Sequence, residues 1–162
     1  MRLILFDGYG TLFDRAMETL YETCQTVVDD LKLDMTREAF LNHWDGYFFP
    51  MIRAGEFMTF WNAHMIGLNR AFDDLDVTGD SEKYVSGLFE AFGRVPLYED
   101  VKPALEALEG VKTGVVSNAD HGHLTSALKT NGLVFEVVVS SESARCYKPN
   151  VYIFYDALKQ FD

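Results

Sequence analysis

The chain alternates short, unbroken apolar runs with longer stretches in which apolar residues recur every three or four positions. The unbroken runs lie at residues 2–6, 111–116 and 137–139. Runs of this kind are typical of parallel strands that are buried on both faces. Helical spacing follows at residues 100–108, 124–128 and 151–161. Strands that alternate with helices predict an α/β fold with a doubly wound parallel sheet.

Residues 14–95 form a second kind of region, which contains no strong strand signal. Its spacing predicts four helices, at about residues 15–31, 36–49, 56–72 and 81–92. Thr36 and Ser81 are suited to start two of them. The many aromatic residues here form a helical core, and some of them are candidates to line an apolar pocket. The sequence therefore predicts an α/β domain of residues 1–13 and 96–162, interrupted by a helical domain of residues 14–95.

Composition and charge limit the classes of partner. The chain has 162 residues, of which 48% are apolar, and a formal net charge of −11. A negative mean field repels a phosphate backbone, so no nucleic acid is expected. No apolar run is long enough to cross a membrane and no targeting signal is visible, so we expect no membrane partner and a cytoplasmic location. Cys24 and Cys146 match no metal-ligand spacing and are interpreted as reduced thiols.

Polar residues follow each of the predicted strands. Asp7 comes directly after the first strand, Ser117 closes the second, and a serine-rich loop follows Val139. The carboxyl ends of parallel strands meet at one edge of the sheet, which is where ligands bind in such folds. The sequence therefore predicts one shared site at this edge.

The most informative stretch runs from Phe6 to Asp14 and reads Phe-Asp-Gly-Tyr-Gly-Thr-Leu-Phe-Asp. Gly8, Gly10 and Thr11 permit a tight turn whose backbone N–H groups can hold an anion or a leaving group while Asp7 attacks. The alternative is that Asp7 only caps the turn.

This stretch resembles the first motif of the haloacid dehalogenase superfamily, Asp-x-Asp/Tyr-Gly-Thr-Leu, at its place near the N-terminus. Val115-Val116-Ser117-Asn118 is similar to the second motif, and Tyr147-Lys148-Pro149 is similar to the third. The helical region resembles the family's helical cap. The resemblance implies a Rossmann-like core, a hydrolase that works through a covalent aspartyl intermediate, and a small anionic substrate.

By this resemblance Asp7 is the nucleophile. Ser117 and Asn118 would hydrogen-bond the substrate's oxygens or the nucleophile, and Lys148 would pair with Asp7 and stabilise charge in the transition state. Substrate binding is assigned to Gly8, Gly10, Thr11 and Asn118. The residues alone leave two other interpretations open, in which Ser117 is a helix N-cap and Lys148 is a solvated surface lysine.

Tyr9 separates two branches of the family. Phosphatases in the superfamily usually carry an aspartate here, which protonates the leaving group and then activates water. A phenol, with a pKa of about 10, is a poor base near neutrality. A halide needs no proton, so Tyr9 favours 2-haloacid dehalogenase chemistry without a cofactor. The alternative is a Mg²⁺-dependent phosphatase, whose metal would be held here by Asp7 and the backbone carbonyl of Tyr9, too few ligands for octahedral coordination.

Two features depart from the dehalogenase pattern or lie outside it. Those enzymes bind the substrate carboxylate with an arginine early in the cap, where this chain has Asp45. The arginines that are candidates to replace it are Arg15, Arg37 and Arg53. Near the second motif, His121 and His123 are interpreted as supporting or surface residues rather than metal ligands, with Asp120 as a helix N-cap.

The family's acidic fourth loop does not occur in these 162 residues. We therefore expect either that the protein continues beyond Asp162 or that a chain of this length is inactive and prone to associate, including with a second copy, through an open strand edge. Three functions follow: a dehalogenase, a phosphatase, and a non-catalytic binding or assembly protein built on a truncated hydrolase fold.

Overall fold

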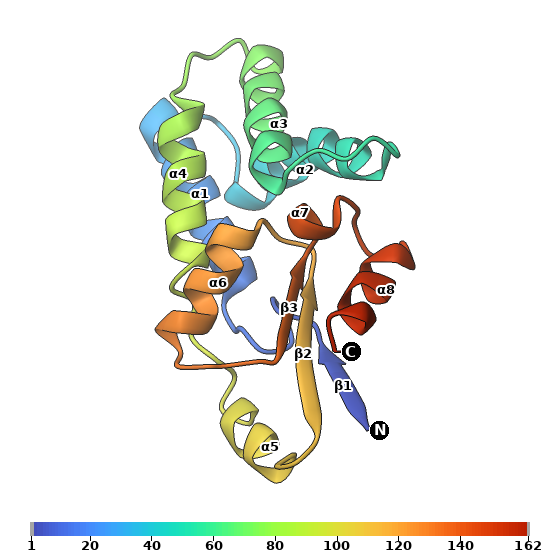
Figure 1. The fold of residues 1–162 in the computed structure, drawn as a ribbon. Coiled ribbons are helices and arrows are strands. Elements are labelled where there is room, and N and C mark those ends of the chain that lie inside the picture. The colour runs from blue at the N-terminus through green and yellow to red at the C-terminus, as the bar shows by residue number, and fades with distance from the viewer. Residues whose placement is uncertain (1, 162) are drawn as a thin grey trace. The chain divides into compact units, whose positions relative to one another are not determined.

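A computed structural model describes residues 2–161 of the chain, and its elements are labelled in Figure 1. The chain divides into two compact units. The first combines Met1–Ala16 with Phe92–Asp162, and the second is Met17–Ala91.

The first unit is built on a three-stranded parallel sheet. Its strands are β1 (Leu3–Phe6), β2 (Lys112–Ser117) and β3 (Val137–Ser140), in the order β1-β2-β3. The register aligns Phe6 with Val115 of β2, which in turn aligns with Val138 of β3. The predicted parallel α/β architecture is confirmed.

Helices cover both faces of this sheet (Figure 1). The face of Val115 packs against α5 (Val101–Ala107) and α6 (His121–Thr130). The face of Val116 and Val139 packs against α8 (Tyr152–Lys159) through Ile153 and Ala157. A short helix, α7 (Ser141–Ala144), follows β3 directly. Apolar residues on both faces explain why these strands read as unbroken apolar runs.

Helix α8 is apolar on its outer side as well. The large apolar side chains exposed there are those of Val151, Tyr152, Phe154, Tyr155 and Leu158. Among residues 2–161, β1 pairs with β2 alone, so its other edge carries no strand. An unpaired strand edge and exposed apolar side chains both favour association, and oligomerisation stays a prediction.

The second unit is helical. Its helices are α1 (Ala16–Leu31), α2 (Arg37–Arg53), α3 (Phe60–Asp74) and α4 (Ser81–Phe92), of which α1 and α4 each reach one residue into the first unit (Figure 1). Thr36 caps α2 as predicted, because its Oγ1 accepts the N–H of Ala39. Ser81 does not cap α4: Asp80 accepts the N–H of Lys83, and the Ser81 hydroxyl donates to Asn69.

Two helix ends differ from the prediction. Helix α2 continues four residues past Phe49, with Pro50 inside it, because packing outweighs the hydrogen bond that proline removes. Met51 of this extension packs beside Gly67 of α3. Helix α3 begins at Phe60 rather than near residue 56, since Thr59 accepts the N–H of Asn62 and so sets the first turn.

Aromatic rings fill the interior of the helical unit. Trp44 is fully buried and donates its indole N–H to the carbonyl of His64, with 3.1 Å between the heavy atoms. The His64 ring stacks on Phe48 at 4.2 Å and lies edge-on to Phe60. A pocket of about 300 Å³ in this unit lies instead between α1 and α4, and these rings do not line it.

Two expectations from composition concern the whole chain. Within residues 2–161, no helix has the length and apolar character that a membrane span requires. Cys24 and Cys146 are both free thiols, and burial raises the pKa of Cys24 to about 12.

Candidate active site

Strand β1 delivers Asp7 to the carboxyl edge of the sheet, one residue past the last strand residue. Its side chain remains 44% exposed. The N–H of Gly8 donates to Asp7 Oδ1 over 2.7 Å. A solvent-accessible carboxylate that is already oriented by one backbone donor has the placement that a nucleophile needs.

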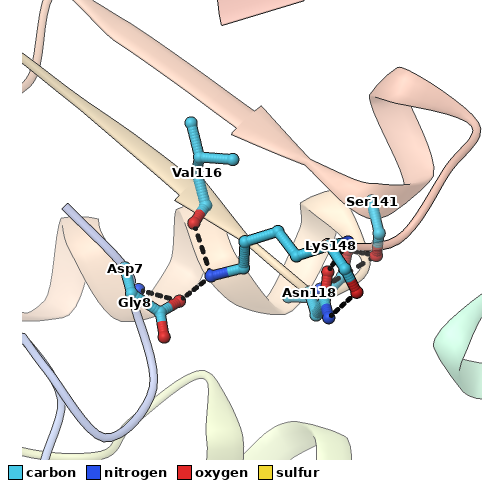
Figure 2. Close-up of polar contacts among 7 residues, drawn as sticks. Asp7, Gly8, Val116, Asn118, Ser141 and Lys148 are labelled. Carbon is cyan, nitrogen blue, oxygen red and sulfur yellow. Dashed lines mark hydrogen bonds and ion pairs between the residues drawn. The ribbon is translucent and has the colours of Figure 1, made fainter. Parts of the chain in front are cut away.

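Lys148 lies directly against Asp7. Its Nζ is 2.5 Å from Asp7 Oδ1 and donates to the carbonyl of Val116 over 3.0 Å (Figure 2). The lysine side chain is only 21% exposed, so it is not the solvated surface residue of the alternative interpretation. The ammonium therefore connects the end of β1 to the end of β2, although Lys148 lies 141 residues from Asp7 in the sequence.

Asn118 holds the backbone of Lys148. Its Oδ1 accepts the Lys148 N–H over 2.7 Å, and its Nδ2 donates to the Lys148 carbonyl over 3.3 Å (Figure 2). The sequence predicted that this amide would bind substrate oxygens or the nucleophile. In the structure its carbonyl and one N–H serve another part of the protein.

Ser117 is buried, with 1% of its surface exposed, at the end of β2. It is not a helix N-cap, because that position at the start of α6 belongs to Asp120. A Cβ added to Gly8 would lie 2.9 Å from Ser117 Oγ and 3.2 Å from its Cβ. Glycine at position 8 therefore lets the nucleophile loop approach the end of β2.

The turn after Asp7 uses its own N–H groups. The Gly8 carbonyl accepts N–H bonds from Thr11, Leu12 and Phe13, and the Gly10 N–H donates to the Phe13 carbonyl. Gly10 has a φ of +85°, which glycine adopts readily. The sequence predicted that Gly8, Gly10 and Thr11 would offer N–H groups to a substrate. In this structure those groups are bonded inside the loop, because a tight turn satisfies its own donors.

Tyr9 turns its hydroxyl to backbone rather than to a carboxylate. The phenol donates to the Phe92 carbonyl over 3.2 Å, and its ring packs against Phe13, Phe92 and His123 at 5.2 to 5.6 Å between centroids. Burial raises the pKa of Tyr9 well above its usual range. A phenol in this environment stays protonated and does not serve as a base.

The two histidines near β2 differ. His123 is buried beside Tyr9 and Phe92, and burial lowers its pKa to about 4. His121 is exposed at the start of α6, where its backbone N–H donates to Glu142. Asp120 occupies the predicted N-cap position, but its side chain makes no capping hydrogen bond. Within residues 2–161, acidic, histidine and cysteine side chains do not gather into a metal-binding group of three or more.

Sequence reasoning missed Ser141, which is fully buried. Its Oγ accepts the N–H of Ala119 and donates to the Ala119 carbonyl, both over 3.0 Å. The available signal was the serine-rich loop after β3, which looked like one polar tract and did not show which serine turns inward. The candidate arginines of the helical region are engaged locally: Arg37 pairs with Glu38, and Arg53 lies over the Phe49 ring.

A family described as haloacid dehalogenase-like hydrolase matches residues 1–162. An L-2-haloacid dehalogenase from Xanthobacter autotrophicus has a TM-score of 0.75 at 21% identity, covering 98% of this chain and 64% of its own. A structure of an L-2-haloacid dehalogenase from the same organism with chloropropionic acid covalently bound has a TM-score of 0.72 at 20% identity, with the same coverage.

A third similar structure is a magnesium-bound HAD-hydrolase from Bacillus subtilis. Its TM-score is 0.78 at 16% identity, with 98% of this chain and 73% of its own covered. The chain thus spans roughly two thirds of the length of these solved proteins, and identities this low support the shared fold alone. A search of curated proteins gave no match.

Proposed function

The chain belongs to the haloacid dehalogenase-like hydrolases, as its three motifs predicted, and on that premise we propose that it removes halide from a small 2-haloacid. Asp7 is the proposed nucleophile. The placement of Tyr9 carries the proposal: its partly buried, protonated hydroxyl donates to the Phe92 carbonyl, so it is poorly suited to serve a leaving group that needs acid and base catalysis. A halide needs neither.

The proposed reaction has two steps. The described contacts of Asp7 fall on Oδ1, so Oδ2 is the oxygen that attacks. An electron pair from Oδ2 forms a bond to the carbon that carries the halogen, and the carbon–halogen bond breaks to release halide. Water then adds to the carbonyl carbon of the resulting ester, which regenerates the Asp7 carboxylate and releases a 2-hydroxy acid and a proton.

Lys148 has two proposed roles in this scheme. It holds Asp7 in one orientation through Oδ1, which keeps the attacking oxygen aligned with the substrate. It also stabilises the negative charge that develops when water adds to the ester. No cofactor is needed, and the proposed partner is a small anionic molecule.

A substrate panel tests the proposal. Chloride release from the two enantiomers of 2-chloropropionate is compared with phosphate release from p-nitrophenyl phosphate, each with and without magnesium. We expect metal-independent chloride release from at least one enantiomer. Phosphate release that depends on magnesium, without chloride release, would favour the phosphatase instead, and inactivity toward both would favour a binding or assembly role.

Tyr9→Asp sharpens the choice between the two enzymes. In a dehalogenase, a second carboxylate near Asp7 is expected to slow halide displacement by like-charge repulsion. In a phosphatase, the same change supplies the missing acid and base and raises activity with magnesium. Tyr9→Phe is the matched control, because it removes the hydrogen bond to Phe92 without adding charge.

A further inference from the structure

Two segments at the carboxyl edge of the sheet are joined by reciprocal hydrogen bonds. One of them follows β2 and contains Asn118 and Ala119. The other segment follows β3, begins with Ser141 in the short helix α7 and continues into the loop that contains Lys148. The Asn118 amide pairs with both backbone polar groups of Lys148, while the Ser141 hydroxyl pairs with both backbone polar groups of Ala119 (Figure 2). Each pair joins a side chain of one segment to the backbone of the other.

The Asn118 pair has a defined orientation. An amide oxygen faces the Lys148 N–H and an amide nitrogen faces the Lys148 carbonyl. Turning the amide over would place donor against donor and acceptor against acceptor, so the partners themselves fix which atom is oxygen. The shorter bond, 2.7 Å, holds the N–H side of the lysine.

Lys148 is thereby held at both ends of its side chain. Asn118 fixes the backbone from which the side chain leaves, while Asp7 and the Val116 carbonyl fix the ammonium. A free lysine side chain has about 2 kcal/mol of rotamer entropy, which is lost when the chain is confined to one conformation. Because Asn118 fixes the Lys148 backbone, the ammonium stays within reach of Asp7. Less conformational entropy must therefore be lost during the reaction.

We infer that Asn118 is a positioning residue, which acts on the reaction through Lys148. The inference rests on the proposed function for its kinetic consequence. The substrate-binding role that the sequence suggested for Asn118 stays a prediction, because Lys148 takes up only one of the two N–H bonds of its amide.

A double-mutant cycle distinguishes the two roles. Asn118→Ala is expected to lower kcat roughly tenfold, the scale of one lost alignment contact, with little change in KM. In a Lys148→Ala background the same change should cost nothing further, because the residue through which Asn118 acts is gone. Additive losses in kcat, or a loss confined to KM, would overturn the inference in favour of direct substrate contact.

Chemical labelling of Lys148 supplies a readout that needs no substrate. The protein is treated briefly with acetic anhydride, and acetylation of each lysine is measured by mass spectrometry, with exposed Lys129 as the internal reference. In the wild type, the ion pair and the Val116 carbonyl should protect the Lys148 amine. Asn118→Ala is expected to raise Lys148 labelling several-fold relative to Lys129.

Ser141→Ala is the matched control, since it breaks the neighbouring reciprocal pair and leaves the Asn118 amide in place. It should leave Lys148 labelling close to the wild-type value. Equal exposure of Lys148 in both variants would assign positioning to the loops as a whole and overturn the role of Asn118. Should Asn118→Ala fail to fold, Asn118→Ser is labelled in its place, with the same expected rise and the same contradicting result.

The two readouts separate the inference from the function on which it rests. If the wild type releases no chloride, the proposed function fails, and labelling alone decides whether Asn118 positions Lys148. If chloride is released but Asn118→Ala changes neither kcat nor labelling, the proposed function stands and the inference is wrong.

Discussion

The two units of the molecule accommodate buried polar groups in different ways. In the α/β unit, buried polar atoms bond across loops that are far apart in sequence, as Ser141 does with Ala119. In the helical unit, the imidazole of His64 is surrounded by aromatic rings, and Trp44 bonds to its carbonyl. The first arrangement can hold charged groups in a fixed geometry, whereas the second gives a rigid apolar interior. The carboxyl edge of the sheet is therefore the part of the molecule that is suited to hold reacting charged groups.

Burial shifts the pKa values of titratable groups in both units, and for His123 and Asp45 it acts with opposite sign. It lowers the pKa of His123 in the α/β unit to about 4, because the charged form of histidine is disfavoured. It raises the pKa of Asp45 in the helical unit to about 6, because the charged form of a carboxyl is disfavoured. The contributions of these two groups to stability should therefore change in opposite directions as the pH falls.

The largest expected effect is that of Asp7→Asn. An amide is close in shape to the carboxylate but a very weak nucleophile, so kcat should fall at least about a thousandfold. The free energy of unfolding should change little, since the side chain is substantially exposed. Steady-state chloride release measures the fall in kcat, and thermal unfolding measures the change in stability. Retention of most of the activity would place the nucleophile elsewhere.

Lys148→Ala should have the next largest effect. Loss of a charge that stabilises a developing anion costs on the order of a hundredfold in kcat. Lys83→Ala is the control, because Lys83 also forms an ion pair, with Asp30, but lies in the helical unit and is more exposed. Exposed pairs contribute little, so this variant should keep its turnover. Similar losses in both variants would contradict the comparison between the units.

Acid should destabilise the α/β unit through His123. The folded pKa lies below the unfolded value of 6.5, so the stabilisation is present above pH 6.5 and is lost as the pH falls toward 4. The loss should approach roughly 3 kcal/mol. His123→Phe removes the titratable group and fills the same aromatic site, so the variant should not show this loss. Hydrogen exchange of peptides from β2 and α6, at pH 7 and pH 4.5, measures the loss of stability. An equal loss in the variant would exclude His123 as the cause.

The smallest effect concerns Asp45. Its folded pKa lies above the unfolded value of 3.8, so stability is greatest below that pH and falls as the pH rises through 6. Asp45→Asn should therefore stabilise the helical unit at pH 7, by about 1 kcal/mol because the half-buried group is partly screened by solvent, and not at pH 3.5. Fluorescence reports on this unit, since both tryptophans, Trp44 and Trp61, lie in it. Stabilisation that is independent of pH would contradict the assignment.

Much of the fold could be predicted because it depends on local patterns. Apolar runs gave the strands, helical spacing gave the helices, and Thr36 marked one helix start. The polar network at the site could not be predicted in the same way. The partner of Asn118 lies 30 residues away and that of the Tyr9 hydroxyl lies 83 residues away, and no local pattern specifies which distant backbone group comes close. The end of α2 was not predicted, because packing outweighs the helix-breaking tendency of Pro50.

The close approach of Gly8 to Ser117 has a consequence for how such a sequence can change over time. Any side chain at position 8 would place a Cβ too near the hydroxyl and the Cβ of Ser117 for both to keep their positions. The two positions are therefore epistatic: the cost of a side chain at position 8 depends on which residue occupies position 117. Alanine at position 8 requires Ser117 to move or to be replaced by a residue without the hydroxyl, so a mutational path that begins at position 8 meets a cost that a path beginning at position 117 avoids.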